Sequence, residues 1–134
     1  MSGLNGYGFG SWSDVPREVL NKHIERQVVS GDQLMMAKLF LKKDAFVGVH
    51  SHPNEQFTYI LSGKVLFRYG VNMENEVVVA AGEVLHIPAN IPHSALCLEE
   101  AIDLDIFTPL REDWLTASGN DYFSGRTKQS VDSV

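Results

Sequence analysis

Hydrophobic and polar residues alternate along most of the chain in short runs that are typical of β-strands. The runs are rich in β-branched and aromatic residues and are separated by Gly, Pro, Asn, Asp and Ser. They cover residues 24–29, 34–41, 57–61, 64–69, 76–80, 84–88, 94–98 and 102–107. Because runs recur about every 8–12 residues with no long amphipathic helix between them, we predict an antiparallel all-β sandwich or barrel.

Turn residues between these runs predict where the chain reverses. Ser30-Gly31-Asp32 separates the first two runs, and Ser62-Gly63 separates residues 57–61 from 64–69. Both segments are typical of hairpin connections. We therefore predict one hairpin at each of them.

The two ends of the chain differ in composition from its middle. Residues 1–13 are rich in Gly, Ser, Asn and aromatics, which favours an irregular arm. Ser13 or Asp14 could cap a short turn or helix with Pro16 in its first turn. We predict an arm over 1–23, a barrel over 24–116 and a polar tail over 117–134.

Length, cysteine content and charge narrow the class of protein. At 134 residues and 44% hydrophobic, the chain has room for one domain with a substantial core. The single cysteine, Cys97, excludes an intrachain disulfide framework, and the lack of a leader or long apolar run favours a cytoplasmic location. The net charge of −6 without a Lys/Arg cluster disfavours nucleic acid and membrane partners. An anionic ligand must therefore be captured by a local positive site.

A candidate metal site lies just before residues 57–61. His50, His52 and Gln56 share strand parity and can point to one face, whereas Glu55, the competing oxygen donor, points away. Convergent imidazole and oxygen donors suit a divalent metal. A lone pair of histidines two residues apart is more often a surface or turn feature, but the strand-like flanks favour a site in the core.

A second candidate group closes the predicted barrel. Asp105 and Phe107 share a strand face, so the carboxylate is inside if the phenyl ring is inside. Burial raises the pKa of such a carboxylate and a metal lowers it, which suits a general base. The structural alternative is an ion pair between Asp105 and Arg111. His86, in an apolar run, is predicted to be a packed histidine and not a ligand, and His23 a surface residue.

These spacings resemble two motifs of the cupins, which are small jelly-roll barrels of two sheets. The motif positions fall on Asp44, His50, His52, Gln56 and Gly63, and on Gly82, Pro88, Asn90 and His93. Asp44 and Asn90 replace motif glycines at turns where positive φ is expected, which Asp and Asn tolerate best among non-glycine residues.

The cupin resemblance implies a four-ligand metal site. Its ligands would be His50, His52, Gln56 and His93, holding one divalent transition metal such as Ni, Zn, Fe or Mn. Gln56 stands where the motif has glutamate. A neutral amide leaves the charge of the ion uncompensated, so we expect a stronger electrophile and anion trap.

Residues 50–56 and 104–113 also resemble the single-domain pectin-degradation (KdgF-like) cupins. These enzymes open the ring of 4,5-unsaturated monouronates released from pectin or alginate. The resemblance implies that the metal and Arg111 hold a small anionic substrate by its carboxylate, that Asp105 moves protons, and that Phe107 packs against the sugar. It also implies a homodimer that pairs through its sheets.

Two alternatives belong to other classes. An Fe(II)-dependent cupin dioxygenase would also use three histidines with open coordination positions. A non-catalytic cupin would use the metal only to bind or sense a small anion. A redox-silent metal without O₂ consumption argues against the first, and turnover of an unsaturated uronate excludes the second.

Overall fold

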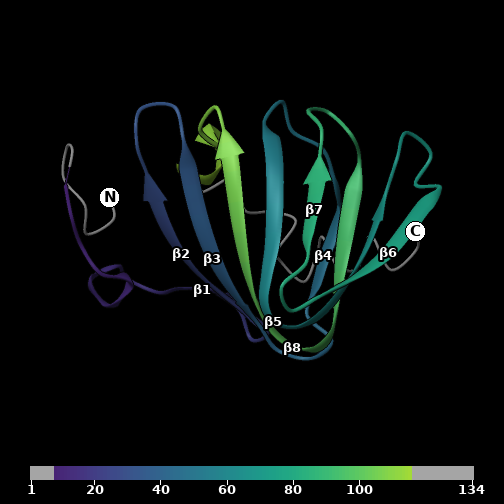
Figure 1. Cartoon of the computed structure of the whole chain (residues 1–134), viewed down its shortest axis with the longest axis horizontal. Helices are drawn as coiled ribbons and strands as arrows, with labels where there is room; N and C mark the ends of the chain where they lie inside the picture. Colours follow the sequence, from purple (N-terminus) through teal and green to yellow (C-terminus); the bar gives the residue numbers. More distant parts are fainter. Residues whose placement is uncertain (1–7, 116–134) are drawn as a thin grey trace.

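The computed structural model describes residues 8–115, and antiparallel β-strands dominate this part of the chain (Figure 1). The strands are β1 (Glu18–Asn21), β2 (Ile24–Ser30), β3 (Met35–Leu41), β4 (Phe46–His50), β5 (Glu55–Tyr69), β6 (Asn75–Ala80), β7 (Val84–Ile87) and β8 (His93–Thr108). Two short 3₁₀ helices are η1 (Trp12–Asp14) and η2 (Glu112–Leu115). The predicted antiparallel jelly-roll class is confirmed. No helix within residues 8–115 has the length and hydropathy needed to cross a membrane.

Two long strands, β5 and β8, belong to both halves of the barrel. The first half of β5 pairs with β7 and with the second half of β8, which continues to β3, β2 and β1. The second half of β5 pairs with β6 and with the first half of β8, which continues to β4. Figure 1 shows both strands bending at the bottom of the view and rising into two arms. We call these arms the β3 sheet and the β4 sheet.

The bend lies where the sequence predicts a hairpin turn at Ser62-Gly63, and that prediction is wrong. The chain does not reverse there, because β5 runs on from Glu55 to Tyr69 with shifts of register around residues 60–65. Gly63 has φ +83°, and a Cβ at this position would overlap the carbonyl oxygen of Glu100. A glycine at this position therefore bends the strand instead of ending it. The predicted strands 94–98 and 102–107 are likewise one strand, β8.

The predicted arm takes part in the sheet. Residues 18–21 form β1 and pair with β2. The predicted cap at Ser13 or Asp14 is wrong, because Ser11 caps η1 and Asp14 closes the capping box from inside the helix. Pro16 follows the helix, outside its first turn. The domain boundaries stay predictions, and the tail lies outside the described residues.

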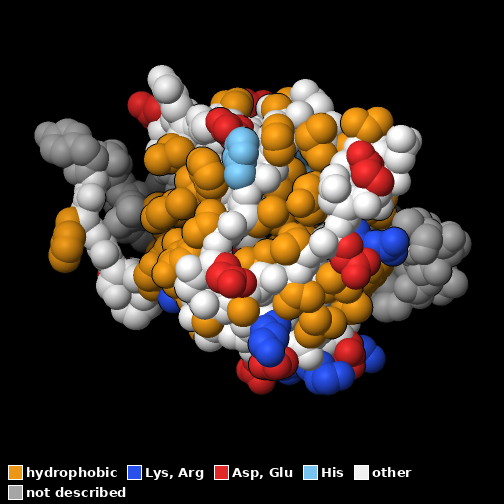
Figure 2. Space-filling view, turned by 45° about the vertical axis from the view of Figure 1, so that its right-hand side comes forward, with side chains coloured by type: hydrophobic (Ala, Val, Ile, Leu, Met, Phe, Trp, Pro, Cys, Tyr) orange, Lys and Arg blue, Asp and Glu red, His pale blue; other side chains and the backbone are white. Residues whose placement is uncertain are grey.

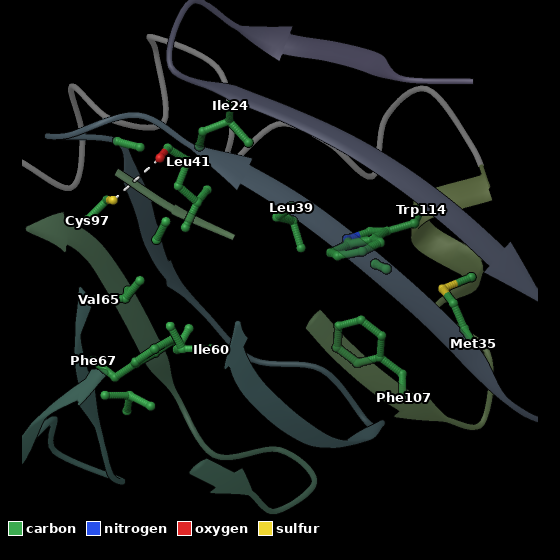
Figure 3. Close-up of a cluster of buried hydrophobic side chains, with 14 residues drawn as sticks. Ile24, Met35, Leu39, Leu41, Ile60, Val65, Phe67, Cys97, Phe107 and Trp114 are labelled. Carbon is green, nitrogen blue, oxygen red and sulfur yellow. Dashed lines mark hydrogen bonds between the residues drawn. The ribbon is translucent and has the colours of Figure 1, made fainter. Parts of the chain in front are cut away.

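Apolar side chains from both sheets fill the space between the arms (Figure 3). On β3 every second residue is buried, as strand parity requires. Near η2, Phe107 and Trp114 meet edge to face with ring centroids 5.1 Å apart. The turn residues Asp44 and Asn90 have φ of 75° and 66°, which confirms the expectation of positive φ at both.

One outer face of the barrel is also rich in hydrophobic side chains (Figure 2). The exposed fraction of Phe57 is 47%, and Tyr59, Leu61 and Val84 are also exposed. Phe57, Tyr59 and Leu61 alternate with the buried residues of β5, so they point away from the interior.

Candidate metal site

Three histidines from different parts of the chain meet at the open end of the barrel. His50 ends β4, His93 begins β8 and pairs with His50 in the sheet, and His52 lies in the loop that follows β4. The ring centroid of His93 is 4.2 Å from that of His50 and 5.0 Å from that of His52. One ring nitrogen from each histidine lies within 4.8 Å of the others. This geometry can hold a divalent metal ion.

Main-chain carbonyls fix the orientation of all three imidazoles. Each Nδ1 lies at hydrogen-bond distance from a carbonyl oxygen two residues away, at Gly48 (2.7 Å), Asn54 (3.1 Å) and Ile91 (2.8 Å). An imidazole that donates through Nδ1 presents the lone pair of Nε2 to a metal. The Nε2 of His93 is buried without a hydrogen-bond partner. A bound cation would satisfy this buried atom.

Burial keeps the three imidazoles neutral. Loss of hydration lowers the pKa of His50 well below its ordinary value, lowers that of His52 to about 4, and lowers that of His93. The positive charge of Arg111 lowers all three pKa values further. Neutral imidazole is the form that ligates metals, so no proton must be displaced near pH 7.

Gln56 brings an oxygen to the same cluster. Its Oε1 lies 3.0 Å from Nε2 of His52. A neutral His52 that donates Nδ1–H to Asn54 has only a lone pair at Nε2, so two acceptor atoms face each other. A cation bound between them would resolve this, because both atoms could then give their lone pairs to it. The donor set therefore fits a divalent metal.

The other two histidines and Glu55, the competing oxygen donor, lie outside this cluster. Glu55 faces outward, as parity predicts, and its carboxylate lies 2.7 Å from Nε2 of His86. The prediction of a packed His86 is wrong, because β7 turns this side chain to the surface, where it lies against Phe57. His23 is half-buried and lines a separate hollow.

A line of buried side chains connects Gln56 to two carboxyl groups. Nε2 of Gln56 donates to Oγ1 of Thr58 (2.7 Å), which donates to Oδ1 of Asp105 (2.8 Å). Asp103 lies beside Asp105, and burial raises the pKa of both, that of Asp103 well above its ordinary range. Their mutual hydrogen bond raises the pKa of Asp103 and lowers that of Asp105, so Asp103 holds the shared proton. The predicted internal carboxylate is thus one of a pair.

Arg111 is buried beside this pair. Its Nε and Nη2 donate to the two carboxylate oxygens of Asp113, at 2.9 and 2.7 Å. The bidentate ion pair is therefore with Asp113, whereas the sequence alternative paired Arg111 with Asp105. The guanidinium carbons of Arg111 and of the fully buried Arg26 each lie 4.5 Å from the ring centroid of Trp114. Two buried cations thus share one indole near the site.

A cavity of about 40 Å³ joins these groups. The polar side chains that line it are His50, Gln56, His93, Asp103, Asp105 and Arg111. Phe107 forms an apolar wall and meets the ring of His52 edge to face. A larger hollow of about 450 Å³ is lined by His52, Asn54 and Asp113, among others. Ligand pockets typically hold about 300–1,000 Å³, so only one functional group fits inside the cavity itself.

The chain is similar to a known protein family and to a named enzyme. The Cupin domain family matches residues 39–107. The 3-hydroxyanthranilate 3,4-dioxygenase of Brucella anthropi is 27% identical over 97 residues, which cover 70% of this chain and 53% of the dioxygenase. The chain thus spans about half the length of this relative.

Solved structures share the fold as well. An RmlC-like cupin from Shewanella frigidimarina has a TM-score of 0.72 and 27% identity, over 84% of this chain and 98% of that chain. KdgF from Halomonas sp. has a TM-score of 0.70 and 21% identity, over 76% of this chain and 94% of that chain. The likeness to KdgF is one of fold alone.

Proposed function

Because the chain belongs to the Cupin domain family, we propose that it is a metal-dependent isomerase or lyase that linearises 4,5-unsaturated monouronates from pectin or alginate. One observation carries this proposal. Two histidines of the neutral three-histidine cluster line one small cavity together with a buried carboxyl pair and a buried arginine. Linearisation needs an electrophile, a proton carrier and an anion site, and no redox cofactor.

The proposed metal ligands are His50, His52, Gln56 and His93. A divalent ion bound there supplies an electrophile that polarises a substrate oxygen. Gln56 adds no charge to the ligand set, so the site keeps a strong attraction for an anionic substrate. Sequence and geometry suit Ni, Zn, Fe and Mn alike.

Arg111 and the cavity size determine how a uronate would bind. The cavity of about 40 Å³ admits the carboxylate of the sugar, while the ring lies outside, toward the hollow lined by His52 and Asn54. The Nε edge of Arg111 is held by Asp113, so the substrate carboxylate approaches another part of the guanidinium. Phe107 is buried in the wall of the cavity, so it would contact the part of the substrate that enters it.

Asp105 is the proposed proton carrier. Ring opening removes a proton from a hydroxyl group, and conversion of the enol to the ketone returns a proton to carbon. Asp105 accepts from Thr58 and shares one proton with Asp103, so the pair can take up a proton and release one in turn. Burial raises the pKa of Asp105 toward the range of a useful general base.

A cupin dioxygenase is the second candidate, and the similarity to the Brucella anthropi enzyme favours it. Three histidine ligands leave coordination positions that suit Fe(II) and O₂. That reaction consumes O₂, whereas uronate linearisation does not. The non-catalytic alternative, an anion-binding cupin, predicts metal and anion binding without turnover.

The test combines metal analysis with two activity assays on the purified full-length protein. We expect about one divalent metal per chain and loss of the unsaturated-uronate absorbance without O₂ uptake. His86→Ala serves as the matched control, because this exposed histidine lies outside the cluster, and it should keep both metal and activity. Turnover of an aromatic substrate with O₂ uptake would establish the dioxygenase instead. Anion binding with no turnover of either substrate would favour the non-catalytic, anion-binding cupin.

We also propose that the protein pairs with a second copy through the outer apolar face. Phe57, Tyr59, Leu61 and Val84 expose hydrophobic area there, and a two-fold pairing would bury this face on both copies. Light scattering should give the mass of a dimer, and Tyr59→Lys with Leu61→Lys should give that of a monomer. A monomeric native protein would refute the pairing.

A further inference from the structure

We infer that Thr58 is a positioning residue that orients the amide of Gln56 and makes glutamine, not glutamate, the side chain suited to position 56. The inference deepens the proposed function, because it rests on Gln56 being a metal ligand. Its basis is the pair of hydrogen bonds that Thr58 makes with Gln56 and Asp105, in which each donor and acceptor role is fixed.

The chain of contacts is short and shielded from water. Thr58 is fully buried, and the exposed fractions of Gln56 and Asp105 are 5% and 7%. The hydroxyl of Thr58 lies 2.7 Å from Nε2 of Gln56 and 2.8 Å from Oδ1 of Asp105. Buried polar groups with no access to water depend on one another for hydrogen bonds.

Donor counting fixes the direction of these bonds. The amide Nε2 can only donate, so the Thr58 oxygen accepts from it. The hydroxyl has one proton, and that proton is left for Asp105, which accepts it. Gln56 therefore turns its NH₂ group toward Thr58 and its Oε1 toward the histidines. The oxygen then lies where a metal ligand is needed.

A glutamate at position 56 would not fit this direction. Its carboxylate only accepts, and Asp105 on the other side of Thr58 also accepts. Two acceptors would compete for one hydroxyl proton, and the loser would be left buried without a partner. The departure from the cupin motif at position 56 thus follows from the residues at 58 and 105.

The opposite amide orientation makes a different prediction. If Oε1 faced Thr58, the hydroxyl would donate to it, and a carboxylate at position 56 would accept the same bond. Gln56→Glu would then be tolerated. The response to this one substitution separates the two orientations.

The experiment is a double-mutant cycle on the full-length chain, stripped of metal with a chelator. Gln56→Glu should lower the melting temperature by roughly 5–10 °C, because it leaves a buried acceptor unpaired. Asp105→Asn should change it little. Combining the two reverses the hydrogen bonds, since the new amide donates to Thr58 and Thr58 donates to the new carboxylate. The double variant should regain most of the lost stability.

Zn²⁺ affinity gives a second readout that needs no substrate. If the two substitutions acted independently, the Zn²⁺ affinity of the double variant would follow from the product of the two single-variant effects. We expect it to be at least about fivefold higher than that, which is within the range of coupling measured for residues in one network. Any ion pair between His52 and the new carboxylate is present in both variants, so it cancels from the coupling.

Thr58 substitutions provide the controls. In a Thr58→Val background the hydroxyl is gone, so the coupling between positions 56 and 105 should fall by more than half. Thr58→Ser keeps the hydroxyl and should keep the coupling. Gln56 also contacts Asp105 directly, so coupling that persists in full with Thr58→Val would mean that this direct contact carries it, and would overturn the inference. A Gln56→Glu protein as stable as the native one would overturn it too.

These outcomes are independent of uronate turnover. A native protein that linearises no uronate but shows the coupling refutes the proposed reaction and retains the role of Thr58. Uronate turnover without coupling between positions 56 and 105 would support the proposed reaction and refute the role of Thr58.

Discussion

Asp105→Asn separates catalysis from stability, because the structure offers a partner to both the oxygen and the NH₂ group of the new amide. The amide oxygen can accept from Thr58 in place of Oδ1, and its NH₂ group can donate to Asp103, which then gives up its proton. The pair keeps one negative charge in either case. The side chains are nearly isosteric, so no cavity forms.

The two effects differ widely in size. We expect turnover to fall roughly a hundredfold, the scale of a lost general base, which is about 2.7 kcal/mol of activation free energy. Stability should change by less than about 1 kcal/mol, because the substitution leaves no additional buried group unpaired. Even a loss of about 1 kcal/mol from a stability of about 5 leaves only ~0.1% of the molecules unfolded. Unfolding therefore cannot produce a hundredfold loss of activity.

The assay follows the absorbance of an unsaturated monouronate at saturating concentration, with metal content and melting temperature measured on the same sample. Native-like turnover by Asp105→Asn would show that Asp105 is not the proton carrier. An activity loss that merely tracks a loss of metal would also contradict the reasoning, since the role would then be structural.

Three further predictions follow from the site and the bend. Arg111→Lys keeps the charge but loses the planar fork, so KM for the uronate should rise with little change in kcat; an unchanged KM would contradict substrate binding there. Gly63→Ala should unfold the protein, because its methyl group would overlap the Glu100 carbonyl. Gly82→Ala, at φ +86° with no atom within 4 Å, should lower the free energy of unfolding in urea by only about 1–2 kcal/mol, and equal losses for the two variants would refute the role of the Glu100 contact. Because the pKa of His52 is lowered to about 4, protons compete with Zn²⁺ for this imidazole only at low pH. The affinity of the protein for Zn²⁺, measured by competition with a chelator, should therefore stay constant from pH 7 to about pH 5.5. A steep loss of affinity within this range would contradict the prediction.

Local sequence patterns were sufficient where the structure depends on parity or turn chemistry. The outward direction of Glu55 and the positive φ of Asn90 agree with the structure, and they follow from the geometry of one strand and one turn. Asp103 could have been found in the same way, because it shares parity with Asp105. His50, His52 and Gln56 do meet, but they come from β4, the loop after it and β5, so the parity of a single strand is not the cause.

Other features depend on long-range pairing that a local pattern does not contain. Gly63 is equally compatible with a turn and a bulge, and the approach of Glu100 decides for the bulge. His86 lies in an apolar run, but β7 leaves one face open to solvent. Arg26 and Trp114 are far apart in sequence, and only the pairing of β2 with β3 and the position of η2 bring them together.

The bend shared by β5 and β8 gives the proposed metal a mechanical role. In the proposed ligand set His50 and His93 belong to the β4 sheet and Gln56 to the β3 sheet, at the end of the barrel opposite the bend. An ion bound by all of them would cross-link the two sheets, as a disulfide would in a chain with more than one cysteine. At a free metal concentration a thousand times Kd, this link adds about 4 kcal/mol to a typical stability of about 5–15. Loss of the ion would therefore loosen the open end of the barrel first, while the bend and the apolar core hold the other.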